Sequence, residues 1–215
     1  MSQHTLTLLR FTYKKLKEKL TVSDSKKLFH EKFPYVIPGL YKRIVDETLV
    51  ELNLLNHQNE FKEEYLFCIG LTETFKELMK GYKPEKHLDL LFESLCSSTN
   101  FVAKEIKETS QKFQEVFKDK SSKDLLKLLK EKNNSKLYPS RILNLGMYKI
   151  ITNSPDFKDG NESETTKILF DFFEKLNLSN NKAEKDIGIY KSSINKMQQA
   201  KELMEELRNK NKKGD

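Results

Sequence analysis

The sequence predicts an all-α protein: a single multi-helix domain with an amphipathic N-terminal arm and a long C-terminal coiled-coil-like helix. Apolar residues recur at spacings of three and four along most of the 215-residue chain, the period of helices that bury one face. With only 7 glycines and 5 prolines, the chain shows no convincing hairpin signal. Its 14 Phe and 8 Tyr are enough large side chains to build a core.

The first element expected is an amphipathic helix over residues 5–20, within an arm of residues 1–20. Its apolar positions form a heptad-like seam, and its lysines form a basic polar side. We interpret it as a solvated arm helix rather than a membrane-surface helix. The seam consists of Leu6, Leu9, Tyr13, Leu16 and Leu20.

The body is expected over residues 21–177. Thr21 to Asp24 supply capping oxygens for a helix that continues through Phe33. The prolines of "FPYVIPG" then force an extended elbow. The helix over 39–55 is apolar around well over half of its circumference, so we expect it to be the most buried element of the fold.

The rest of the body is expected to be helical as well. A helix over 63–80 ends at Gly81, and Pro84 opens the next helix at its first turn, which buries Leu88, Leu91, Phe92 and Leu95. Polar loops separate the later segments. Further helices are predicted over residues 101–118, 122–132, 140–152 and 164–176.

The last unit, residues 178–215, is predicted as a helix over about 181–210 followed by a disordered tail. Gly188 and Lys201 weaken its thin seam, and the ending "RNKNKKGD" offers nothing to bury. We therefore expect this helix to project in part from the body, with residues after about 208 disordered. The seam consists of Ile187, Tyr190, Ile194, Met197, Lys201 and Met204.

The charge and composition restrict the class of protein. The net charge is +7, but lysines are interleaved with 32 acidic residues, so the charge is weak support for a basic nucleic-acid-binding protein, which we keep as the alternative function. No apolar run reaches the roughly 18 residues of a membrane span. Cys68 and Cys96 lie in apolar helical contexts, as expected for core residues in a reducing compartment.

The polar stretch "TLVELNLLNHQNEF" raises the possibility of a metal or acid–base site. Arg43, Asp46, Glu47 and Glu51 share one helical stripe, in which Arg43 can pair with Glu47. No histidine has a carboxylate three residues before it, as a di-metal helical site requires. We interpret the stripe as a solvated or ion-paired face and a candidate interaction surface, and residues 56–59 as a turn. We expect no metal, no cofactor and no catalytic residue.

Between residues 21 and 96 the sequence resembles the thylakoid formation protein family of cyanobacteria and plastids. The resemblance rests on "TVSDSKKLF", "IPGLYKRIVDETLVELNLL" and "GLTETFKELMKGYKP". Asn53 stands where family members usually have His, and this chain lacks the proline that they carry near Leu66. The first 20 residues look like an extension before the usual start, either a real arm or a misassigned start codon.

The resemblance implies an all-helical, non-enzymatic auxiliary protein of photosynthetic membrane biogenesis. It further implies a role in photosystem II assembly or repair and binding to the membrane-bound FtsH protease. The expected location is cytoplasmic, with peripheral attachment to the thylakoid membrane, whose anionic lipids would attract the lysine-rich surface weakly. No specific nucleic acid is expected as a partner, and the oligomeric state is left open.

Overall fold

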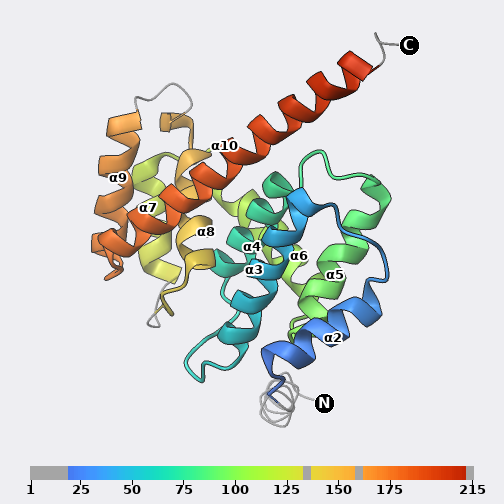
Figure 1. Ribbon diagram of the computed structural model, residues 1–215. Coiled ribbons are helices and arrows are strands. Elements are labelled where there is room, and N and C mark those ends of the chain that lie inside the picture. The colour runs from blue at the N-terminus through green and yellow to red at the C-terminus, as the bar shows by residue number, and fades with distance from the viewer. Residues whose placement is uncertain (1–18, 133–136, 158–161, 212–215) are drawn as a thin grey trace.

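The computed structural model describes residues 19–132, 137–157 and 162–211, and within these ranges all regular structure is helical (Figure 1). This confirms the all-α prediction. The expected helix over residues 5–20 falls mostly on residues 1–18, which lie outside the described part. The helices are α2 (Val22–Lys32), α3 (Gly39–Asn56), α4 (Tyr65–Leu78), α5 (Leu88–Ser98), α6 (Ala103–Phe117), α7 (Ser122–Lys132), α8 (Arg141–Thr152), α9 (Glu162–Lys175) and α10 (Asn180–Asn211), with short 3-10 turns η1 (Glu85–His87) and η2 (Pro155–Phe157).

The centre of the fold is α4, not α3 as the sequence predicted. Every residue from Tyr65 to Leu71 is buried, so the first half of α4 is covered on all sides, and the helix packs mainly against α6 and α8. Helix α3 keeps one open side, on which Leu54 is exposed. The apolar face of α3 is wide, as predicted, but the hydropathy pattern counts apolar residues and does not show which helix is surrounded by its neighbours.

Helices α4 and α8 approach each other so closely that their backbones touch. A Cβ atom placed on Gly70 would lie 1.9 Å from the carbonyl oxygen of Ile142, and one placed on Gly146 would lie 1.9 Å from that of Leu66. Backbone atoms cannot yield as a side chain can, so both positions require glycine. Close packing here buries six consecutive residues of α8, from Ile142 to Met147.

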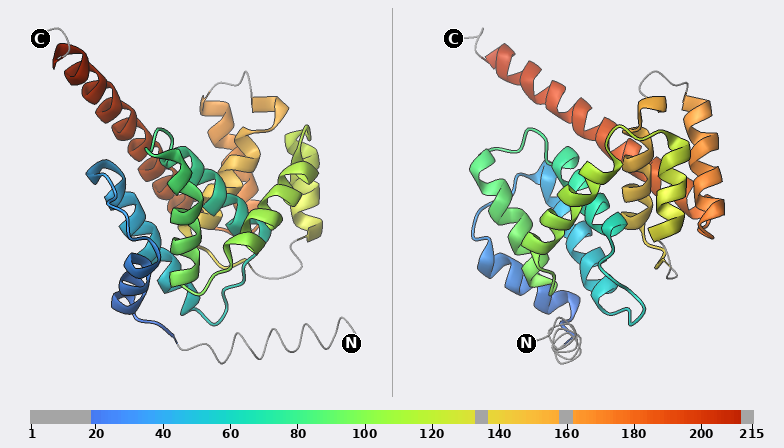
Figure 2. Two further views of the ribbon diagram at one scale, coloured as in Figure 1. Left: turned by 90° about the vertical axis from the view of Figure 1, so that its right-hand side faces the viewer. Right: turned by 180° about the vertical axis from the view of Figure 1, so that it is seen from behind.

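The N-terminal helices pack on one side of this centre (Figure 2). Thr21 and Asp24 form a reciprocal capping box at the start of α2, as their sequence spacing predicts. The buried Asn53 of α3 donates hydrogen bonds to the Leu20 carbonyl and to Ser25 Oγ, both at 2.8 Å. Asn53 therefore links α3 to the N-terminal end of α2. In the connection between α4 and α5, Pro84 precedes η1, and α5 begins only at Leu88, later than predicted.

Helix α10 crosses the body and extends beyond it (Figures 1 and 2). Its 32 residues correspond to about 48 Å at about 1.5 Å per residue. Ala183, Ile187 and Tyr190 are buried among α7, α8 and α9, while Met197 packs into the cluster formed by α2, α3 and α5. Leu203 is exposed. The partial projection is thus as predicted, but the helix continues to Asn211, past the predicted boundary of order near residue 208. Residues 212–215 lie outside the described part.

Candidate functional site

The polar stripe on α3 divides into an outer and an inner part. Arg43 Nε donates to Glu47 Oε1 at 2.7 Å, which is the predicted pair, and Lys42 Nζ donates to Asp46 Oδ2 at 2.7 Å. The Arg43 side chain is 82% exposed. Such exposed pairs stabilise a helix by only about 0.3–0.5 kcal/mol, so these charges are available to a partner at little energetic cost.

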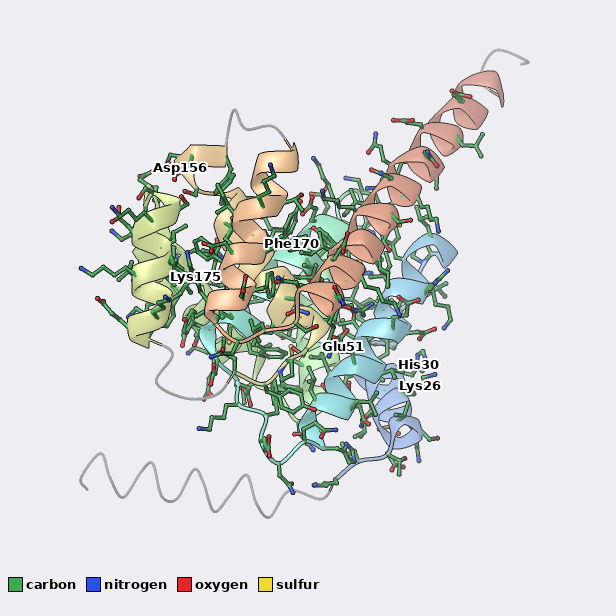
Figure 3. The ribbon with its side chains drawn as sticks, turned by 90° about the vertical axis from the view of Figure 1, so that its left-hand side faces the viewer. Lys26, His30, Glu51, Asp156, Phe170 and Lys175 are labelled. Carbon is green, nitrogen blue, oxygen red and sulfur yellow. The ribbon has the colours of Figure 1, made fainter. Side chains whose placement is uncertain are left out.

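Glu51 belongs to the inner part, because its side chain is only 17% exposed. It accepts hydrogen bonds from Arg141 Nε at 2.8 Å and from the Ile142 backbone N–H at 3.3 Å. Burial raises the pKa of this carboxyl, while the charge and hydrogen bonds of Arg141 oppose that effect. In Figure 3, Glu51 lies where α3 meets the side of the molecule formed by α8 and α10. It is therefore a link between α3 and the first turn of α8, not part of an open surface.

A cleft lies beside this link, where α3, α4, α8 and α10 meet. Its volume of about 50 Å³ has room for one or two water molecules, not for a substrate. The outer part of the stripe, made of Lys42, Arg43, Asp46 and Glu47, is called the outer stripe. Its residue Glu47 lies at the rim of the cleft. A larger open cavity of about 370 Å³ lies between α8, α9 and α10, with Gly188 and Phe170 in its wall. Phe170 is labelled in Figure 3.

A polar cluster next to the cleft joins α4, α8 and α10. The Glu77 carboxylate accepts hydrogen bonds from both Lys149 Nζ and the Tyr190 hydroxyl. Lys149 Nζ also lies 5.0 Å from the centre of the Tyr190 ring. Burial raises the pKa of Glu77, but the hydrogen bonds from Lys149 and Tyr190 and the Lys149 charge outweigh it, so the pKa is lowered. Burial and the bond to Glu77 raise the pKa of Tyr190. This cluster holds α10 against the body.

Two further polar contacts hold α10. The Asn144 side-chain amide donates to the buried Asp186 carboxylate at 2.8 Å. Lys201 Nζ donates to the Lys80 carbonyl just after the end of α4. The dipole of α4 also favours a positive charge at this C-terminal end. In the sequence pattern Lys201 weakens an apolar seam, whereas in the structure its hydrogen bond helps to hold α10 against the body.

The remaining candidates for chemistry occupy ordinary structural positions. Helix α3 ends at Asn56, and a ring nitrogen of His57 lies 2.8 Å from the Asn53 carbonyl, so the Asn/His/Gln/Asn stretch is the predicted helix end and turn. Burial raises the pKa of the Cys68 and Cys96 thiols to about 12. Within the described ranges no group of three His, Cys, Asp or Glu could hold a metal ion.

None of the helices in the described part is long and apolar enough to span a membrane.

The sequence indicated Glu51 but not its partner Arg141, nor the separate cluster of Glu77, Lys149 and Tyr190. Arg141 lies 90 residues from Glu51, and Glu77 lies 72 residues from Lys149 and 113 residues from Tyr190, so no local pattern pairs them. The polar stripe on α3 was the one available signal, and it did not distinguish the buried Glu51 from the exposed Arg43 and Glu47.

Comparison with known proteins places this architecture in a family. The family model for "Thylakoid formation protein" matches residues 21–215. The chain is 79% identical over 198 residues to Protein Thf1 of Prochlorococcus marinus (strain MIT 9312), covering 92% of this chain and 98% of that protein. It is 38% identical over 190 residues to Protein Thf1 of Synechococcus sp. (strain CC9605), covering 86% and 87%. A solved structure of Psb29 superimposes with a TM-score of 0.79 at 27% identity, covering 90% of this chain and 98% of that one.

Proposed function

The chain belongs to the thylakoid formation protein family, and from this premise we infer that it acts as an interaction protein rather than as an enzyme. Membership of the family supports a role in thylakoid biogenesis. The match over residues 21–215 carries this conclusion, because it includes the whole helical body and α10. The resemblance in the sequence adds the finer expectation of a role in photosystem II assembly or repair, with the membrane-bound FtsH protease as partner.

The outer stripe of α3 is the surface proposed to bind FtsH. Arg43, Asp46 and Glu47 present both signs of charge on one exposed face, and their weak pairing leaves them free to exchange partners. Charges at the rim of an interface mainly set specificity and association rate. Glu51 is left out of this surface because Arg141 occupies its carboxylate.

A double charge reversal tests this assignment. Arg43→Glu combined with Glu47→Arg keeps the net charge and the i,i+4 pairing but inverts the pattern that a partner meets. Lys104→Glu with Glu108→Lys is the matched control, because it inverts an exposed i,i+4 pair on α6. FtsH recovery from a photosynthetic membrane extract is expected to fall at least fivefold for the α3 variant, since mismatched interface charges cost about 1 kcal/mol or more.

Recovery unchanged by the α3 variant, or reduced equally by both variants, would remove the stripe from the interface. If the tagged wild-type protein fails to recover FtsH, the proposed partner is wrong. The nucleic-acid alternative stays a prediction, and duplex binding that falls steeply with salt concentration would favour it.

A further inference from the structure

The elbow between α2 and α3 presents apolar side chains outward in an unusually open position. Val36 is 92% exposed and Tyr35 is 46% exposed. In Figure 1 the elbow is the blue connection that runs along the outside of the molecule between these helices. An exposed valine is ordinary by itself, but here it lies midway along a connection held at both ends.

The elbow is fixed in place by its own residues. Phe33 is buried at one end, and Ile37 packs on the same hydrophobic cluster at the other. Between them, the Tyr35 ring stacks on His87 of η1, with ring centroids 3.9 Å apart and planes at 22°. Pro34 and Pro38 restrict the backbone further. The elbow is therefore preorganised, and binding through it would cost little conformational entropy.

Lysines are frequent in the two segments that meet at the elbow. Residues 26–38 and 80–87, the two segments that Tyr35 and His87 bring together, contain six lysines and two glutamates. All six lysines are exposed, and the Lys83 ammonium pairs with Glu85. These segments hold much of the excess positive charge of a chain whose net charge is +7. The six are Lys26, Lys27, Lys32, Lys80, Lys83 and Lys86.

We propose that the α2–α3 elbow is a membrane-docking tip that inserts Val36 and Tyr35 into the interface of an anionic lipid surface while the surrounding lysines contact the headgroups. This inference goes beyond the proposed function, which concerns a protein partner. Two apolar side chains are too few for a stable protein interface, which buries about 800 Å² per partner. In a bilayer each side chain contributes by itself, aromatic rings favour the interface, and each nearby lysine adds about 1 kcal/mol.

Vesicle co-sedimentation of the full chain tests the proposal. Vesicles of phosphatidylcholine with phosphatidylglycerol supply the anionic surface, and vesicles of phosphatidylcholine alone are the neutral reference. Wild-type protein is expected to bind the anionic vesicles and to lose most of this binding in high salt. Val36→Asp is expected to weaken binding about tenfold, and Lys86→Gln about fivefold, the equivalent of one headgroup contact. Leu54→Asp is the matched control, because Leu54 is 53% exposed on a different part of the surface.

A fluorescent label locates the contact. Cys68 and Cys96 are buried, so a thiol-reactive dye will modify Val36→Cys selectively. The dye at position 36 is expected to shift to shorter wavelength on anionic vesicles, while the same dye on Leu54→Cys is expected to stay in water.

Three results would overturn the proposal: no binding of wild-type protein to anionic vesicles, equal binding of wild-type and Val36→Asp protein, or equal loss with Leu54→Asp. Absence of vesicle binding combined with loss of FtsH recovery by Val36→Asp would make the elbow a protein contact. FtsH recovery that depends on the α3 stripe but not on Val36 would leave the proposed function intact while the lipid assignment fails.

Discussion

Two contacts of the fold, the crossing of α4 with α8 and the docking of α10, are built in opposite ways. At the crossing, the two backbones touch at Gly70 and Gly146. The residues around both glycines form unbroken runs of buried positions in α4 and α8. Helix α10 is held instead by separated anchors: the apolar Ala183, Ile187, Tyr190 and Met197, and polar contacts through Asp186 and Lys201.

The difference shows where this molecule can and cannot change. A close-packed crossing tolerates no added atom, because the neighbouring backbone has nowhere to move. A helix held at intervals can lose one anchor and remain folded, and its distal turns open first. We therefore expect substitutions to have large global effects at the crossing and small or local ones along α10.

The largest effect is expected from Gly70→Ala or Gly146→Ala. Either methyl group would meet a carbonyl oxygen at 1.9 Å, so the two helices must separate. We expect each change to lower the free energy of unfolding by about 3 kcal/mol or more, the upper end for overpacking. Urea denaturation followed by circular dichroism measures this. Gly39→Ala, where a Cβ meets no atom within 4 Å, is the control. A loss below 1 kcal/mol at both crossing glycines would show that the crossing is looser than described.

Glu51→Ala is expected to cost about 1–3 kcal/mol, since it leaves the Arg141 guanidinium and the Ile142 N–H without their acceptor. Glu47→Ala removes an exposed partner only and is expected to cost about 0.5 kcal/mol or less. Equal effects at the two positions, measured by the same denaturation, would contradict the division of the stripe into outer and inner parts.

The Glu77 cluster is expected to make the docking of α10 dependent on pH. Its folded-state pKa lies below the ordinary value of 4.5, so the unfolded chain binds the proton more tightly. The stabilisation is therefore complete above about pH 4.5 and is lost as the pH falls through the folded-state pKa. Glu77→Gln is expected to destabilise by about 1 kcal/mol at pH 7, because the side chain is partly exposed. The gap between wild type and variant should narrow below about pH 4.5; a constant gap would mean that ionisation of Glu77 plays no part.

Gly188→Ala is expected to stabilise the protein. Gly188 lies inside α10, and a Cβ there would meet no atom within 4 Å. Replacing a helical glycine by alanine in open space raises stability by about 0.5–1 kcal/mol. Thermal unfolding measures the gain, with the Gly70→Ala protein as the opposite case. A loss of stability would show that the cavity wall near Phe170 is closed in solution.

The smallest global effect is expected from Lys201→Met, which removes the anchor to the Lys80 carbonyl. We expect a change below about 0.5 kcal/mol in global stability but faster amide hydrogen exchange from residue 198 onward, with residues 183–197 unaffected. Lys196→Met, at an exposed position, is the control. Exchange in 198–207 that is as slow as in α4 before and after the change would place this part of α10 in the core.

The sequence by itself determined the helices, their approximate limits and the outer ion pair of α3. These features depend on side chains three or four residues apart, and such spacings can be counted directly in the sequence. It also carried the family resemblance in residues 21–96, which the match over 21–215 confirms.

Only the tertiary structure decided which helix is central, which carboxylate is buried, and what Lys201 does. In the sequence nothing distinguishes Gly70 and Gly146 from other glycines, and their role follows from the crossing of α4 and α8. Likewise, nothing distinguishes Glu51 from a surface carboxylate, and its role follows from contact with Arg141, 90 residues away. Such roles depend on which faces meet, and many arrangements of the same amphipathic helices would satisfy the same hydropathy pattern. Side-chain volume and backbone shape at the contacts, which no local period records, select one of them.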